Sequence, residues 1–268
     1  MSGVLLRATL RQHWRPTLYW SAGLALLGLY VIAVIPDQEA LDNYVGLVAS
    51  MPQPLLDAIG AGDTLLLRTP EGFIQYGFAT WAQLMLAVYG LLAGLNLCAN
   101  EEEAGILDVL LSLPLSRRRL LLERFLAFTL LTLLIVLLSA LGLVLGSGAT
   151  TFNLTPATLF ATAFNLVPGT LLVMAFTALA AAALRRHMVA TGIGIVFVIG
   201  SYFLDFIASA ISEGPLNQLG RLSFYRWSSE GIAPGSFLPA ENLALLLGVT
   251  LVLLAGALWF LDRRDIGL

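Results

Sequence analysis

The sequence contains no lysine, since all fourteen of its basic residues are arginine. A P-loop needs a lysine that reaches the phosphates of the nucleotide, so this chain cannot contain one. If the protein uses ATP, another polypeptide must bind it. The arginine codon bias of a GC-rich genome is a second explanation of the missing lysine. The single cysteine, Cys98, excludes an intrachain disulfide, and two histidines, His13 and His187, cannot form a metal site alone.

Charge is also scarce, because only 12% of the 268 residues are charged and 58% are hydrophobic. Soluble domains carry about 25% charged residues. The apolar residues form long blocks, which indicates lipid as the solvent. We therefore expect an all-α integral membrane protein. The net charge of −3 does not by itself argue for or against binding to nucleic acid. We expect the lipid bilayer as a partner and no nucleic acid.

Six apolar runs are long enough to cross a bilayer as helices. Thr155 and Pro156 are suited to the N-cap and first position of the fourth helix. That run is longer than a bilayer requires, so we expect either that Pro168 kinks it or that its outer part lies at the membrane interface. The predicted spans are residues 18–35, 73–99, 120–145, 156–184, 188–210 and 243–261.

The segments outside the spans contain amphipathic and turn-rich stretches. Arg7, Arg11 and Arg15 recur at i, i+4 and i+8, so residues 1–16 predict an amphipathic helix in the membrane interface. A simple basic flank of the first span is the alternative. Residues 36–72 and 211–240 are punctuated by proline and glycine, and we expect short helices on the outer face there.

The distribution of arginine predicts the orientation of the chain. Eleven of the fourteen arginines lie near residues 7–15, 117–124, 185–186 and 263–264, which six spans place on one side of the membrane. The other three are Arg68, Arg221 and Arg226. The positive-inside rule makes the arginine-rich side the cytoplasm, so both termini are expected there.

The cytoplasmic segment 100–119 is the most informative part of the sequence. Three glutamates begin it, where carboxylates favour a helix N-terminus. Pro114 ends the predicted helix, and Ser116 can cap the next one. A soluble partner that pressed on this short amphipathic helix would move both attached spans, although it could also serve only to order a loop. Its apolar face consists of Ile106, Leu107, Leu110 and Leu111.

Three stretches resemble the permeases of ABC-2 type transporters. The sequence from Glu101 to Arg118 is similar to their loop Glu-Glu-x-Gly-x-Leu-x-x-Leu-Leu-x-x-Pro-hydrophobic-Ser-Arg. The ending Trp259-Phe-Leu-Asp-Arg-Arg-Asp-Ile resembles theirs, and Leu222-Ser-Phe-Tyr-Arg-Trp is similar to a stretch before their last span. Ile106 stands where the family often has threonine, a change on the helix surface.

The resemblance implies the permease subunit of an ATP-binding cassette exporter in the inner (plasma) membrane of a prokaryote. Two permease copies, a homodimer, would work with two copies of a separate ATPase subunit. ATP and Mg²⁺ would lie on that subunit, so this chain would hold no cofactor or metal and no catalytic residue. Its loop would be the coupling helix that docks on the ATPase. The motif positions are Glu101, Glu102, Glu103, Gly105, Leu107, Leu110, Leu111, Pro114, Ser116 and Arg117.

A secondary transporter, or a membrane scaffold or assembly factor without an ATPase, is the alternative function. A secondary transporter tends to show paired broken helices and ionisable residues at mid-bilayer, and this sequence shows neither clearly. Asp205 is the one acid predicted inside a span, and we expect it near the outer interface, solvated or ion-paired. Gln83, Asn96 and Asn165 are candidates for hydrogen bonds between helices or for a pathway lining.

Two pairs of glycines have the GxxxG spacing that lets helices approach closely. They are Gly90 with Gly94 and Gly142 with Gly146. We list them as candidates for a dimer interface, although such pairs also arise by chance in glycine-containing spans.

Overall fold

The computed structural model describes residues 3–52, 56, 67–98, 116–184, 186–209 and 215–263. These residues form helices and their connections, and no strand occurs among them. Six helical stretches within this part of the chain are long and apolar enough to cross a membrane, which confirms the all-α membrane fold with six spans. Their bounds are Val4–Val34, Pro70–Leu97, Arg118–Ser147, Pro156–Ala183, His187–Ser209 and Ala240–Arg263.

The first helix, α1 (Val4–Val34), is continuous through Pro16. The sequence predicted an interfacial helix over residues 1–16 separate from the first span, and the structure shows no break between the two. A proline removes one helical hydrogen bond, and here α9 packs along α1 and keeps both halves in line. At about 1.5 Å per residue, α1 is longer than the hydrocarbon core of about 30 Å requires. Arg7, Arg11 and Arg15 lie in its first turns, and charged side chains are costly in hydrocarbon, so the excess length is at that end.

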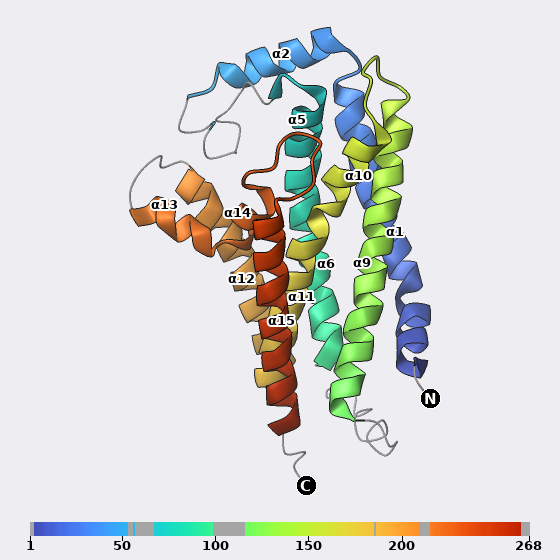
Figure 1. Ribbon diagram of the computed structural model, residues 1–268, viewed down its shortest axis with the longest axis vertical. Helices are drawn as coiled ribbons and strands as arrows, with labels where there is room; N and C mark the ends of the chain where they lie inside the picture. Colours follow the sequence, from blue (N-terminus) through green and yellow to red (C-terminus); the bar gives the residue numbers. More distant parts are fainter. Residues whose placement is uncertain are drawn as a thin grey trace.

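The opposite end of the bundle from the termini carries a short amphipathic helix, α2 (Gln38–Ala49), which lies across the ends of the spans (Figure 1). Asp37 caps it by accepting a hydrogen bond of 2.9 Å from the backbone N–H of Ala40. Its buried face consists of Leu41, Val45 and Val48. This helix agrees with the short helices predicted for the segment 36–72.

The second span begins with α5 (Pro70–Ile74) and ends with α6 (Thr80–Cys98), and a π-helical stretch, η1 (Gln75–Ala79), lies between them. The side chain of Thr69 caps α5 by accepting a hydrogen bond of 3.2 Å from the N–H of Gly72. The third span, α9 (Arg117–Ser147), packs along α1 for most of its length.

The fourth span is interrupted, as the sequence predicted. It consists of α10 (Pro156–Phe164) and α11 (Leu166–Ala183), with Asn165 between them. Pro168 has no N–H for the carbonyl of residue 164, and its ring crowds that carbonyl. The helix therefore breaks just before the proline, which occupies the first turn of α11. Thr155 caps α10 by accepting a hydrogen bond of 3.3 Å from the N–H of Thr158.

Helix α11 is the centre of the bundle, because nearly all of its residues are buried. It packs against α6, α12 (His187–Ser209) and α15 (Ala240–Arg263). Helices α1, α12 and α15 expose many large apolar side chains, which suits contact with lipid. Between α12 and α15 the chain forms α13 (Pro215–Leu219), the 3₁₀ turn η2 (Gly220–Leu222) and α14 (Phe224–Ser229).

Both glycine pairs lie at helix contacts inside the chain. A Cβ on Gly94 would lie 2.5 Å from the carbonyl oxygen of Met174 on α11. A Cβ on Gly142 would lie 2.8 Å from Cα of Ala25 on α1. Gly90 and Gly146 also face α11 and α1. The sequence analysis named these glycines as candidates for a dimer interface. In the structure their faces are covered by α11 and α1 of the same chain, so the close helix contacts are made within one chain.

Candidate functional site

The end of the bundle that holds both chain termini is the first candidate site (Figure 1). We call it the arginine-rich end, because Arg7, Arg11, Arg118 and Arg263 lie in the helical turns nearest to it. Helix α9 begins here, directly after Ser116.

Ser116 stands at the N-cap position of α9, as the sequence predicted, but its side chain makes no capping hydrogen bond. Its carbonyl oxygen instead accepts hydrogen bonds from the N–H groups of Arg119 and Leu120, at 3.0 and 3.1 Å. Arg117 is the first residue of α9. The remaining predicted coupling residues lie outside the described part of the chain, namely Glu101, Glu102, Glu103, Gly105, Leu107, Leu110, Leu111 and Pro114.

The first turn of α9 is joined to the last turn of α15. Nε of Arg118 lies 2.6 Å from Oδ2 of Asp262, with side chains 70% and 31% exposed. Exposed ion pairs of this kind contribute little to stability. Their geometric effect is to hold the two helix ends in register at the arginine-rich end.

Glu123, one turn further along α9, caps the N-terminus of α1. Its two carboxylate oxygens accept hydrogen bonds of 3.4 Å from the backbone N–H groups of Gly3 and Leu6. Gly3 is the N-cap residue of α1 and has no side chain to do this itself. A carboxylate at this position also complements the positive end of the helix dipole. Arg119 holds Glu123 in place through a contact of 2.7 Å.

The start of α9 therefore touches the first residues of α1 and the last residues of α15. The sequence analysis missed these contacts, since only the i, i+4 pair of Arg119 and Glu123 is visible in the sequence. The start of α9 is thus linked to α1 through Glu123 and to α15 through Arg118.

A second candidate site lies where α14 folds back against the bundle. Ser223 accepts a hydrogen bond of 3.2 Å from the N–H of Tyr225, which caps α14, and donates one of 2.8 Å to the carbonyl of Ser201 on α12. Ser201 precedes the last residue of α12, Ser209, by about 12 Å at 1.5 Å per residue. Helix α14 thus lies beside α12 within the depth of the span and not above its end.

Aromatic side chains anchor α14 in this position. The ring of Phe224 stacks on that of Phe197 on α12, with 5.6 Å between centroids, and Phe197 stacks on Phe176 of α11 at 3.9 Å. Tyr225 packs edge-on against Tyr202 at 5.7 Å. Burial raises the pKa of the Tyr225 hydroxyl above its ordinary value, and neighbouring Tyr202 adds to this. Its oxygen forms no hydrogen bond with another described residue.

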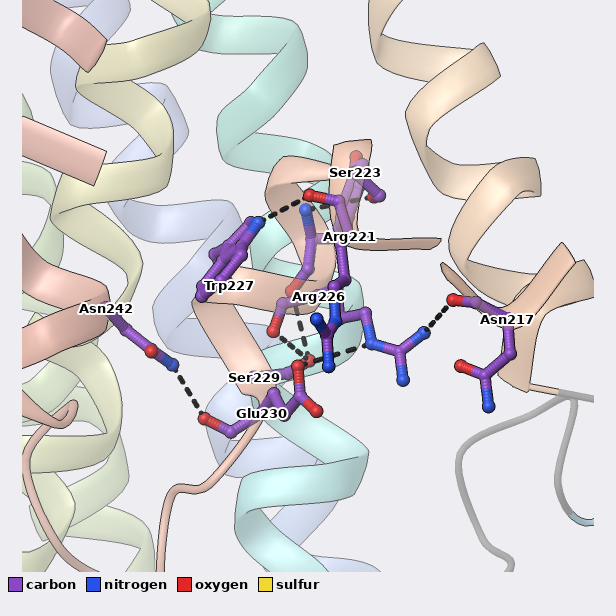
Figure 2. A network of polar contacts seen from close by, with 9 residues as sticks. Asn217, Arg221, Ser223, Arg226, Trp227, Ser229, Glu230 and Asn242 are labelled. Atoms are coloured by element: carbon purple, nitrogen blue, oxygen red, sulfur yellow. Dashed lines mark hydrogen bonds and ion pairs between the residues drawn. The ribbon is translucent and has the colours of Figure 1, made fainter. Parts of the chain in front are cut away.

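Polar contacts close the exposed side of α14 (Figure 2). Arg226 contacts Glu230 at 3.2 Å and donates a hydrogen bond of 3.0 Å to the carbonyl of Asn217. The indole N–H of Trp227 donates to the carbonyl of Arg221 at 2.7 Å. The stretch Leu222-Ser-Phe-Tyr-Arg-Trp therefore supplies a cap, two buried rings and two anchors of the segment that joins α12 to α15.

A buried amide lies at the contact of α6, α11 and α14. The side chain of Gln83 is 4% exposed, and neither of its amide atoms has a hydrogen-bond partner among the described residues. A Cβ on Gly169 would lie 2.9 Å from Nε2 of Gln83 and 2.7 Å from Oγ of Ser228. Gln83 and Ser228 thus approach the backbone of α11 from two other helices, through the space that this glycine leaves.

The other polar residues singled out in the spans have different surroundings. Asn165 donates to the carbonyl of Ser236 at 2.9 Å and accepts from the N–H of Leu238 at 2.8 Å, so it fixes the chain before α15. Asn96 donates to the carbonyl of Leu92, one turn earlier in its own helix. Asp205 is partly exposed on α12 and interacts electrostatically with Arg226 and Glu230 of the α14 segment. No cluster suited to a metal ion occurs among the described residues.

These features define a multi-pass α-helical membrane protein whose third span is tied to both ends of the chain. A family model described as ABC-2 family transporter protein matches residues 21–266. The chain therefore belongs to the ABC-2 transporter family and is an ABC-2 type permease, a membrane component of transport. No curated protein matches the chain.

Proposed function

We propose that this chain is the permease subunit of an ATP-binding cassette exporter. It forms the translocation pathway and couples that pathway to ATP hydrolysis by a separate ATPase subunit. The match of residues 21–266 to the ABC-2 transporter family carries this proposal. The absence of lysine supports it, because a P-loop in this chain would need one.

The proposal places the arginine-rich end in the cytoplasm of a prokaryotic cell, by the positive-inside rule. The stretch 100–119 then lies in the cytoplasm and acts as the coupling helix, with Glu101, Glu102 and Gly105 at the ATPase. It connects α6 to α9, and α9 contacts both α1 and α15. A movement of the ATPase against this stretch would therefore be transmitted to α6, α9, α1 and α15. This favours a permease over a passive scaffold.

The assembly we propose contains two copies of this permease and two ATPase subunits, with ATP and Mg²⁺ on the ATPases. Closure of the ATPases around ATP would move the two coupling helices and reshape a pathway between the permeases. The faces of the two GxxxG pairs are covered within the chain, so the permeases would meet through other surfaces.

Co-expression with a P-loop ATPase encoded by an adjacent reading frame tests this function. We expect the two proteins to co-purify and the reconstituted complex to hydrolyse ATP. The variants Glu102→Ala and Gly105→Leu are expected to reduce co-purification at least tenfold. Glu39→Ala, at an exposed position of α2 at the opposite end of the bundle, is the matched control and should bind normally.

Two results would contradict the proposal. Unchanged ATPase binding by both variants would remove the coupling assignment. Full transport activity of the purified chain without any ATPase, driven by an ion gradient, would favour a secondary transporter.

A further inference from the structure

One face of α1 carries exposed cations at the arginine-rich end. Arg7, Arg11 and Arg15 are all exposed and follow one another at i, i+4 and i+8. They cover about 12 Å of helix at 1.5 Å per residue. In the described parts of the chain, the ion pairs involve other residues and leave these three without an acidic partner. This stripe is therefore a positive surface beside the membrane.

An apolar groove begins one helical turn beyond Arg15, towards the middle of the bilayer. It encloses about 290 Å³, and its lining is almost wholly apolar. The ring of Trp20 on α1 packs edge-on against Tyr89 on α6, with 5.8 Å between centroids, so the two helices that form the groove are held together. The residues that line it are Tyr19, Trp20, Gly23, Leu24 and Met85.

The groove is open to the bilayer. A Cβ built on Gly23 would meet no atom within 4 Å, so this glycine leaves free space. Tyr19 is 78% exposed and Met85 is 40% exposed. Tyr19 lies one turn beyond Arg15 and Gly23 one turn further, and each step of four residues turns only about 40° round the helix, so the three positions are consecutive neighbours on the surface of α1. The cations and the groove therefore form one continuous surface.

We propose that this surface is a binding site for an anionic phospholipid of the leaflet at the arginine-rich end. The headgroup phosphate lies on Arg11 and Arg15, whose guanidinium groups match phosphate oxygens in pairs. One acyl chain lies along the groove between α1 and α6. The positions of the arginines and the groove along α1 support a phospholipid, because the arginines lie at the level of the lipid headgroups and the groove lies at the level of the acyl chains.

A second copy of the chain fits this surface less well than a lipid does. Two permeases in one membrane have the same orientation, so two arginine stripes brought together would lie at the same depth. Like charges at short distance repel, and weakly screened charges near the hydrocarbon repel more strongly. A negatively charged lipid compensates the same stripe.

Native mass spectrometry of the full chain in detergent tests the site. The protein is titrated with phosphatidylglycerol and, separately, with phosphatidylcholine of the same acyl chains. We expect tight binding of phosphatidylglycerol only. The double variant Arg11→Gln/Arg15→Gln should weaken it by about fivefold per arginine, the effect of one basic residue at an anionic membrane surface. Arg221→Gln, an exposed arginine of η2 that lies away from the stripe, is the control and should leave binding unchanged.

The acyl-chain part of the site is tested by filling the groove. Gly23→Leu should reduce phosphatidylglycerol binding. Gly200→Leu on α12, which also meets no atom within 4 Å, should not. Equal binding of the two lipids, or full binding by the arginine double variant, would overturn the proposal. Loss of a dimer on Gly23→Leu with lipid binding intact would also overturn it, because a second copy would then occupy the groove.

A fluorescence measurement tests the same site in the wild-type protein, without the Gly23→Leu substitution. Phosphatidylglycerol with brominated acyl chains is expected to quench Trp20 in the wild-type protein more strongly than brominated phosphatidylcholine does. The extra quenching should disappear in Trp20→Phe. Equal quenching by the two lipids in the wild-type protein would contradict the proposed site.

Discussion

Arg118 and Asp262 are 144 residues apart in the sequence and 2.6 Å apart in the structure. They join the start of α9 to the end of α15, at the end of the bundle where the predicted coupling segment is attached. It is a direct side-chain contact between the third span and the last span.

We predict that Asp262→Asn changes the stability of the protein little but loosens the end of α15. The pair is largely exposed, so its loss should cost less than about 1 kcal/mol of unfolding free energy. Hydrogen exchange in the last turn of α15 should become faster in the variant. Arg118→Gln should give the same result. Slower or unchanged exchange in both variants would show that the pair does not hold α15.

Loss of the cap on α1 is the second prediction. Glu123→Ala removes both acceptors of the Gly3 and Leu6 N–H groups, so these amides should exchange faster with solvent. Glu123→Gln keeps one acceptor oxygen and should have an intermediate effect. Hydrogen-exchange mass spectrometry of the first ten residues measures both. Protection equal to that of the wild type in Glu123→Ala would mean that α1 does not depend on α9 for its cap.

The third prediction concerns the close contact of α6 with α11. Gly94→Ala places a methyl group 2.5 Å from the carbonyl oxygen of Met174 and 2.7 Å from Cβ of Thr177. The two helices must move apart, which should cost about 1–3 kcal/mol of unfolding free energy. Gly192→Ala is the control, since its Cβ would meet nothing within 4 Å, and the gain in helix propensity should make it neutral or slightly stabilising. Unfolding in mixed micelles at increasing SDS compares the two.

Asn165 gives a fourth prediction, because it holds the chain before α15 at two points. Asn165→Leu leaves the part-buried carbonyl of Ser236 and the buried N–H of Leu238 unpaired, at a cost of about 1–3 kcal/mol for the buried group and less for the other. Asn165→Asp retains the acceptor for Leu238, loses the donor to Ser236 and adds a buried carboxylate beside that carbonyl. Protection of the Leu238 amide should therefore persist in Asn165→Asp and disappear in Asn165→Leu. Loss of protection in both would contradict this division of roles.

The fifth prediction separates stability from transport at Gln83. This side chain is buried without a hydrogen-bond partner among the described residues, so Gln83→Met should raise the unfolding free energy by about 1–3 kcal/mol. Gln75→Met is the comparison, because Nε2 of Gln75 donates to the carbonyl of Ile232 at 3.4 Å and only its Oε1 lacks a partner among the described residues, so the gain should be smaller. If Gln83 lines the pathway, the stabilised variant should transport more slowly. A destabilised Gln83→Met would show that the amide is paired.

Much of the fold was predictable from local sequence. Hydropathy located six spans, because every backbone polar group inside a bilayer must be satisfied within its own helix. The break before Pro168 followed from the missing N–H of one residue. The GxxxG spacing correctly predicted close helix approach, but it did not show which helix would approach.

The sequence by itself determined the spans, their length and the interrupted fourth helix, since these depend on residues a few positions apart. It also carried the motifs of the ABC-2 transporter family. Only the tertiary structure decided that Glu123 caps α1, that Gly142 faces Ala25 of the same chain and that Ser223 holds α14 beside α12. These contacts join residues from different elements, and their selection depends on how whole helices pack, which no local pattern encodes.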